Sequence, residues 1–248
     1  MNLNEEHYKI FKSSPPGVWP SSSSPLHWFK WVHDAVNSKY SVDLKPNCLN
    51  ENKLTRIELF EIIKNPKVDT LSCCISILAW GGMNRKHGAE ALAKYANWNQ
   101  IADAIRNGSL DRVEAYEKFA NLRLNFLLPG MGPAYFTKLI FFLLPTNKAS
   151  GFIMDQWTSA SVNLLFGQRI IETQLQKYLQ KNGQYRLSEI VSDKNTKENY
   201  LNFCNCVELI ATDLKKDPAY IEEMLFSQGR GEGEWRNHVV KVRKIAVG

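Results

Sequence analysis

Apolar residues recur along most of the chain at the spacing of an amphipathic helix rather than of a strand. Residues 54–64 and 71–80 show this spacing clearly, and Gly81 and Gly82 end the second segment. Further helices are predicted over residues 26–32 (the start of an aromatic-rich helix), 89–95, 98–106, 110–122, 133–144, 156–166, 199–214 and 217–226. Strand signals are few, so the sequence predicts an all-α fold.

Two segments break the helical pattern. Residues 13–25 hold four prolines and a serine run, which neither a regular helix nor a packed strand accommodates. We therefore expect residues 1–25 to be an N-terminal segment with a Pro/Ser-rich loop, and residues 26–248 to be a helical domain. Residues 229–236 are expected to be a mobile loop before a short basic tail.

Length and composition limit the class of protein. A chain of 248 residues with 44% hydrophobic content can bury a core in one large domain or two small lobes. The net charge of +6 favours polyanions, although the mixture of both signs decides little by itself. No leader is seen and no apolar run approaches the roughly 20 residues of a membrane span. We expect a soluble cytoplasmic monomer, nucleoid-associated if bacterial, with no membrane partner.

The five cysteines are odd in number and lack the usual disulfide or zinc spacing. We expect them to be reduced structural thiols, with no metal site.

The segment Leu-Pro-Gly-Met-Gly-Pro, residues 128–133, carries the strongest functional signal. Between helices 110–122 and 133–144, such a turn presents backbone amides that can bind a phosphate, and glycine lets the phosphate approach closely. Pro133 suits the first turn of the second helix because its missing N–H is not needed there. The pattern Pro-Gly-x-Gly, residues 129–132 here, also occurs in ordinary loops.

Lys138 lies one helical turn from Ala134, Tyr135, Phe141 and Phe142, all apolar. Such neighbours would desolvate the amine and lower its pKa, which an amine nucleophile needs near neutral pH. In the competing interpretation, Lys138 extends along the helix edge and keeps its charge in water.

Asp155 begins the helix predicted over residues 156–166. Its simplest role is an N-cap, worth about 1 kcal/mol. A carboxylate at a helix N-terminus is also a fixed anion that the helix keeps ionised.

The turn, the helix after it and an aspartate 23 residues beyond Gly132 resemble the signature of helix-hairpin-helix DNA glycosylases. Residues 132–139, Gly-Pro-Ala-Tyr-Phe-Thr-Lys-Leu, and the later Asp-Gln-Trp are similar to the 8-oxoguanine DNA glycosylase-like branch. The resemblance implies a two-lobed helical fold with a DNA-binding cleft between the lobes, and a helix-hairpin-helix over residues 110–144.

The resemblance also implies roles for individual residues. Gly130, Met131 and Gly132 would hold a phosphate, and the target nucleotide would be flipped into a pocket. Asp155 would stabilise the charge that develops on the sugar, and Lys138 would attack C1′ and form a Schiff base. A monovalent cation at the hairpin carbonyls is a further implication.

The chain departs from the familiar enzymes in two ways. Their lysine comes two residues after the second glycine, where this chain has Ala134, and Lys138 lies one helical turn further on. No four-cysteine array is found near the C-terminus, so we expect no iron–sulfur cluster.

Secondary candidates come from three other places. Met83, Asn84 and Arg85 form a loop after Gly81-Gly82 that would suit a groove probe, or is only a polar turn, with His87 a surface or capping histidine. Trp157 is a candidate for stacking on the flipped base, with Trp80 a weaker one and a core role the alternative. Five C-terminal cations would contact phosphates or form a solvated tail: Arg230, Arg236, Lys241, Arg243 and Lys244.

The sequence therefore predicts a DNA glycosylase acting on double-stranded DNA that contains a modified base. The resemblance makes 8-oxoguanine the first substrate, with possible abasic-site lyase activity through Lys138. One alternative is a glycosylase for hypermodified phage bases, such as glucosylated hydroxymethylcytosine, in anti-phage defence. Another is a non-catalytic helix-hairpin-helix DNA-binding module.

Overall fold

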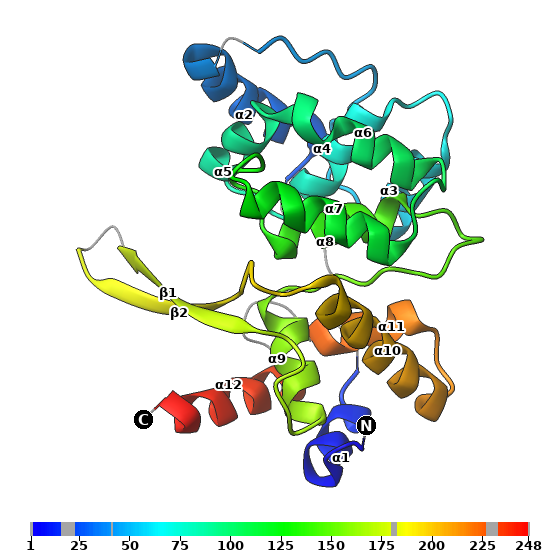
Figure 1. Cartoon of the computed structure of the whole chain (residues 1–248), viewed down its shortest axis with the longest axis vertical. Coiled ribbons are helices and arrows are strands. Elements are labelled where there is room, and N and C mark those ends of the chain that lie inside the picture. The colour runs from blue at the N-terminus through cyan, green and yellow to red at the C-terminus, as the bar shows by residue number, and fades with distance from the viewer. Residues whose placement is uncertain (1, 16–22, 41, 180–182, 227–232, 248) are drawn as a thin grey trace. The chain divides into compact units, whose positions relative to one another are not determined.

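The computed structural model describes residues 2–15, 23–40, 42–179, 183–226 and 233–247, and these residues are mainly helical (Figure 1). The described part of the chain contains twelve helices and one two-stranded antiparallel sheet. The helical fold class predicted from the sequence is confirmed. The expected Pro/Ser-rich loop lies largely outside the described residues, which omit 16–22.

The helices have the following bounds: α1 Glu5–Ser13, α2 Pro25–Tyr40, α3 Arg56–Lys64, α4 Thr70–Trp80, α5 Arg85–Leu92, α6 Tyr95–Arg106, α7 Arg112–Leu124, α8 Pro133–Leu143, α9 Gln156–Leu165, α10 Lys197–Leu214, α11 Pro218–Phe226 and α12 Glu234–Val247. The strands are β1 Thr173–Leu179 and β2 Tyr185–Val191.

The chain divides into two compact units. One comprises residues 19–153 and contains α2 to α8. The other comprises residues 1–18 and 154–248 and contains α1, α9 to α12 and the sheet.

Helix α4 is the central element of the unit formed by residues 19–153. It is buried without interruption over residues 71–79, because it packs against α2, α3, α6 and α8. A helix that is apolar on every side must be surrounded in this way. Helix α8 is buried over residues 136–143, and its Phe136 ring packs against Tyr116 and Phe119 of α7.

Helix α9 occupies the comparable position in the other unit, where it packs against α1, α10, α11 and α12. Ser161 connects three of these elements, since its hydroxyl donates to the Leu225 carbonyl of α11 and accepts from Trp235 Nε1 of α12 (2.8 and 2.9 Å). Buried polar atoms of this kind are matched because an unpaired one would cost about 1–3 kcal/mol.

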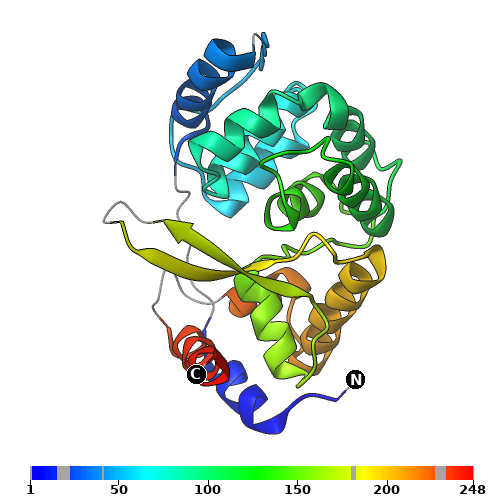
Figure 2. The same cartoon turned by 60° about the vertical axis from the view of Figure 1, so that its left-hand side comes forward.

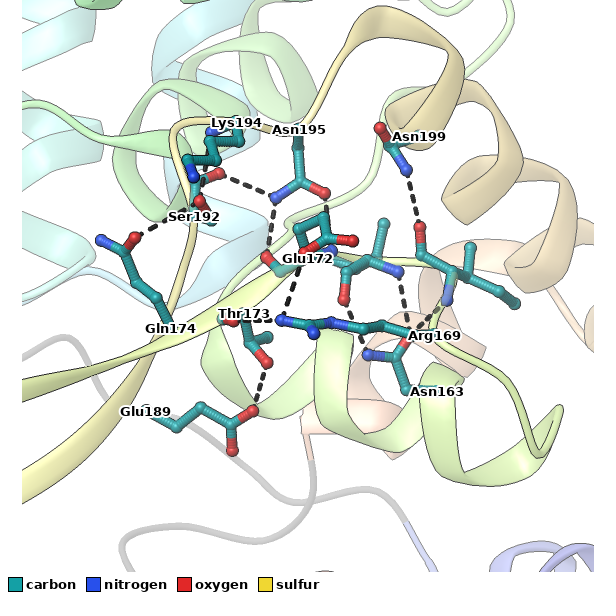
Figure 3. A network of polar contacts seen from close by, with 12 residues as sticks. Asn163, Arg169, Glu172, Thr173, Gln174, Glu189, Ser192, Lys194, Asn195 and Asn199 are labelled. Atoms are coloured by element: carbon teal, nitrogen blue, oxygen red, sulfur yellow. Dashed lines mark hydrogen bonds and ion pairs between the residues drawn. The ribbon is translucent and has the colours of Figure 1, made fainter.

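The strands β1 and β2 were not expected from the sequence. They pair antiparallel from Thr173 opposite Val191 to Leu179 opposite Tyr185. A polar network fixes the base of this hairpin (Figure 3), where the Asn195 side-chain amide accepts from Glu172 N and donates to the carbonyls of Glu172 and Ser192. In Figures 1 and 2 the two strands form a ribbon that extends away from α9, α10 and α11 of their own unit.

The C-terminal region also differs from the expectation. Helix α12 begins at Glu234, so residues 234–236 are not a loop and the residues after them are not an extended tail. Its aromatic residue Trp235 is fully buried and supplies the apolar contact that a solvated tail would lack. The rest of the expected loop, residues 229–232, lies outside the described residues.

Candidate active-site and DNA-binding residues

The turn between α7 and α8, residues 125–132, is held by side chains from outside it. The Asn97 side chain donates to the Leu127 carbonyl (2.9 Å) and the Arg123 guanidinium donates to the Leu128 carbonyl (2.8 Å). Gly132 is the N-cap of α8 and has no side chain to accept from the first amides of that helix. The amides of Met131 and Gly132 donate to no residue in the described part of the chain.

Gly130 shows why a glycine is required in this turn. Its φ is +74°, in the left-handed region, and a Cβ there would lie 2.4 Å from the His87 carbonyl oxygen. The turn therefore packs directly on α5. The structure thus brings the predicted phosphate-binding turn together with the loop that contains Asn84 and Arg85.

The tip of the same turn presents apolar side chains to solvent, which sequence reasoning missed. Phe126 is 90% exposed and also has a positive φ of 58°, and Leu124 and Leu127 are exposed beside it. A bulky residue in the left-handed region costs about 1–3 kcal/mol, and such strain gathers at functional sites. The sequence signal was the apolar run that continues past the end of the predicted helix.

Lys138 lies within the apolar part of α8 and is 8% exposed. Its Nζ donates to the Ala134 carbonyl (2.5 Å) and lies 5.4 Å from the centre of the Tyr135 ring. The amine therefore stays against its own helix and does not extend into solvent. Ala134 and Tyr135 are two of the four neighbours that the helical spacing placed around it.

Gly81 makes room for this lysine. A Cβ at Gly81 would lie 2.7 Å from Lys138 Cδ and 3.0 Å from Cε. The backbone of Gly81 is right-handed (φ −71°, ψ −2°), so any residue could adopt it. Space for the lysine, rather than backbone conformation, is what requires a glycine here.

The loop after Gly82 differs from the groove probe expected from the sequence. Met83 is 1% exposed, and its carbonyl accepts from Trp28 Nε1 (2.6 Å), so its side chain belongs to the core and is not available as a wedge. Asn84 is exposed and caps α5 by accepting from the His87 amide (3.0 Å). Arg85 is exposed and donates to the Trp31 carbonyl (2.7 Å).

Trp80, the weaker stacking candidate, packs edge-on against Phe142 with ring centres 5.0 Å apart. Its indole Nε1 is buried and donates to no described residue. Trp80 therefore packs against the apolar residues of α8, and this contact does not indicate a role in stacking on a base.

Asp155 belongs to the other compact unit and caps α9. Its Oδ1 accepts from the amides of Trp157 (2.8 Å) and Thr158 (3.0 Å), and the Thr158 hydroxyl accepts from the Asp155 amide (2.9 Å). Among the described residues, all the side-chain hydrogen bonds of Asp155 end on Oδ1. Asp155 therefore caps α9 through Oδ1, and in the described part of the chain no group donates to Oδ2.

Two arginines of α12 lie over the ring of Trp157. The guanidinium carbon is 3.6 Å from the ring centre for Arg236 and 5.2 Å for Arg243. Arg243 also pairs with Glu189 of β2 (2.9 Å) and donates to the Gln156 carbonyl (2.9 Å). A base could stack on Trp157 only where these cations leave ring surface free.

Arg236 is buried, and burial changes its pKa. The side chain is 3% exposed and donates to the Phe226 carbonyl. Desolvation lowers the pKa of its guanidinium to about 10, while the Asp155 carboxylate opposes that shift. Arg236 is thus a buried cation within the electrostatic influence of Asp155, not part of a solvated tail.

The other C-terminal cations are less informative. Lys241 is exposed on α12. Lys244 belongs to the same helix, and Arg230 lies outside the described residues.

In the described part of the chain, no three or more His, Cys, Asp or Glu side chains are grouped so that they could hold a metal ion. No helix in that part of the chain has the length and apolar character to cross a membrane.

Comparison with known protein families matches residues 22–226 to the family described as 8-oxoguanine DNA glycosylase OGG-like protein. No match was found among the curated proteins or among the solved structures. The matched region includes the α7–α8 turn, Lys138, Asp155 and the β1–β2 hairpin. Since it spans well over half of the sequence, the chain belongs to this family of OGG-like DNA glycosylases, which act on DNA.

Proposed function

We propose that this protein flips a modified base out of double-stranded DNA and excises it, with Asp155 as the essential carboxylate and Lys138 as the nucleophile. The first substrate to test is 8-oxoguanine, on the strength of the family alone. The observation that carries the catalytic proposal is the carboxylate of Asp155, in which Oδ1 is fixed by the helix while Oδ2 accepts from no donor among the described residues.

A carboxylate fixed in this way suits the chemistry of glycosidic bond cleavage. As the C1′–N bond breaks, its electron pair leaves with the base and positive charge develops on the sugar. Oδ2 can stabilise that charge and accept the proton of the attacking group, while the bonds to Oδ1 keep the carboxylate in one orientation. Both tasks use this carboxylate, which lies directly at the N-terminus of α9.

Lys138 would supply the attacking electron pair. The neutral amine forms a bond to C1′ while the C1′–N electron pair leaves with the base, and one amine proton passes to the departing base. The C1′–O4′ bond then breaks as the second amine proton passes to O4′, which leaves a C1′=N Schiff base. The lysine is largely shielded from water by the apolar part of α8, and its amine is held at the Ala134 carbonyl. Release from that carbonyl would free the amine for attack.

The turn of residues 125–132 would bind the DNA backbone as a helix-hairpin-helix. The amides of Met131 and Gly132 are available to a phosphate oxygen, and Gly130 lets the turn approach closely. The exposed Phe126 and Leu127 would contact the sugars beside that phosphate. A monovalent cation fits less well, since Arg123 already places a positive charge at the Leu128 carbonyl.

The test is release of free base from a panel of duplexes, measured by mass spectrometry. The panel contains 8-oxoguanine, other oxidised bases and glucosylated hydroxymethylcytosine, so that repair and anti-phage activities are separated by the product. We expect Lys138→Gln and Asp155→Asn to lower release by roughly 100-fold or more while DNA affinity is kept.

Borohydride trapping addresses the lyase step separately. A covalent protein–DNA adduct that is lost in Lys138→Gln is the expected result. Full release of base by both variants would remove the catalytic roles of Lys138 and Asp155, whereas no release by the wild-type protein across the whole panel would leave a DNA-binding module.

A further inference from the structure

The β1–β2 hairpin is an exposed element that the proposed chemistry does not use. Six of the seven residues of β1 are exposed, so neither face of the ribbon is covered along that strand. Leu175, Leu179 and Tyr185 are 58%, 64% and 62% exposed. Two strands alone are marginally stable in water, and exposed apolar groups of this kind commonly mark a contact surface.

The base of the hairpin is nevertheless rigidly attached (Figure 3). The Asn163 side chain accepts from the amides of Ile170 and Ile171 (2.9 Å each), and Asn199 donates to the Ile170 carbonyl (2.9 Å). Arg169 pairs with Glu172 at 3.2 Å. The ribbon is therefore held in a fixed direction relative to α9 and α10, as a binding element must be.

The chemistry of the hairpin favours a polyanion. The described hairpin residues 173–179 and 183–188 contain no aspartate or glutamate, while Lys177 and Arg186 give them a charge of +2. They also carry three side-chain amides, from Gln174, Gln176 and Gln184. A segment with cations, amides and tyrosines but no carboxylate can bind phosphates and base edges without repelling either.

The arrangement of these groups suits a duplex. The Lys177 amine lies 4.2 Å from the centre of the Tyr185 ring, so a cation and an aromatic group share one face of the ribbon. Tyr178 and Arg186 are cross-strand partners at the neighbouring position of the register. A two-stranded ribbon is narrow enough to enter the major groove of B-DNA, which is about 12 Å wide.

The hairpin is also connected to the candidate site within its own unit. Glu189 of β2 binds Arg243, and Arg243 lies over Trp157, two residues after Asp155. The Thr173 hydroxyl of β1 donates to the same glutamate. DNA held by the ribbon would therefore lie on the element that supports the residues around Asp155.

We infer that the β1–β2 hairpin is a second DNA-contacting element, distinct from the α7–α8 turn, that places its basic and aromatic residues along duplex DNA. The inference takes only one point from the proposed function, which is that the ligand is DNA. It does not require that Lys138 or Asp155 be catalytic.

The experiment measures binding of the full-length protein to an unmodified fluorescent duplex by anisotropy, over a range of salt concentrations. Lys177→Gln combined with Arg186→Gln is compared with Lys9→Gln combined with Lys215→Gln, which removes the same charge from exposed positions outside the hairpin. We expect the hairpin variant to bind about tenfold more weakly near 0.1 M salt, and its slope of log affinity against log salt to fall by roughly 1 to 2. The control pair should match the wild type.

Equal affinity and equal salt slope for the hairpin and control variants would overturn the inference. It would also be overturned if wild-type protein sediments as a dimer that Leu179→Lys converts to a monomer with unchanged DNA affinity, because the ribbon would then serve self-association. Weaker binding by the hairpin variant, together with no base release by wild-type protein, would keep this inference and reject the glycosylase proposal. Base release with unaltered binding by the hairpin variant would do the reverse.

Discussion

At the scale of single residues, the two proposed catalytic groups are held by different means. Asp155 is fixed by the helix that it caps, so the same hydrogen bonds stabilise α9 and orient the carboxylate. Lys138 is fixed by space, because the absence of a side chain at Gly81 defines where its methylenes lie. The sequence identified both residues and the cap. It did not identify Gly81 as a neighbour of Lys138, because that contact joins α4 to α8 across 57 positions of the chain.

Gly81→Ala should therefore act on Lys138 rather than on the backbone. The new Cβ would displace the end of a flexible side chain, so we expect little change in the unfolding temperature and unaltered DNA affinity. Borohydride trapping should slow by roughly 10- to 100-fold, as a displacement of about 1 Å can cause.

The matching control is Gly81→Ala in a Lys138→Ala background, where the added methyl group meets no lysine. Unchanged trapping by the single variant would show that the lysine is not positioned by this contact.

At the scale of elements, the α7–α8 turn and helix α5 form one structural piece. The sequence predicted the two helices, the turn and the need for glycine. It could not predict that Gly130 rests on the backbone of His87, because the packing partner of a turn depends on tertiary structure.

The β1–β2 hairpin was missed for a different reason. Both faces of the ribbon are exposed, so β1 lacks the alternation that marks a half-buried strand, and Asn182-Gly183 was the available signal of a hairpin.

Gly130→Ala should be strongly destabilising, because the new methyl group meets a rigid carbonyl 2.4 Å away in addition to the positive φ. Gly167→Ala is a matched control, since its φ is +60° and nothing lies within 4 Å of the added Cβ. We expect the control to lose about 1–2 kcal/mol of unfolding free energy in urea. The Gly130 variant should lose roughly 1–3 kcal/mol more, which is the cost of overpacking. Equal losses would mean that the contact with His87 is not tight.

At the scale of the whole molecule, composition and helical periodicity were enough to predict a mainly helical fold, and the short turn signature was enough to indicate the family. The sequence did not predict α1, the ribbon or α12. Half of the residues of α12 are apolar, but the cations among them led to the interpretation of a basic tail, and the buried contact of Trp235 with Ser161 depends on tertiary structure. The division into two units is also a property of long-range contacts, since residues 1–18 join residues 154–248.

Acid should weaken both units through one histidine in each. Burial is the main cause that lowers the pKa of His87 and of His238, and the neighbouring His7, whose Nδ1 lies 3.0 Å from His238 Nε2, lowers the second further. Glu90 opposes the shift at His87, and Glu6 and Glu234 oppose it at His238, but the net direction is downward. The unfolded chain therefore binds more protons than the folded chain as the pH falls below about 6.5, the ordinary histidine value. The stability contributed by the neutral histidines is present above that pH and is lost as the pH falls towards the lowered folded pKa values.

Urea unfolding at pH 7.5 and pH 5.5 should show a lower midpoint in acid, and His87→Gln combined with His238→Gln should reduce the difference between the two midpoints. A midpoint difference that is unchanged in this double variant would assign the acid sensitivity to carboxylates, of which Glu58 and Glu198, whose pKa values are lowered by hydrogen bonds with Thr55 and Thr196, are the first to test.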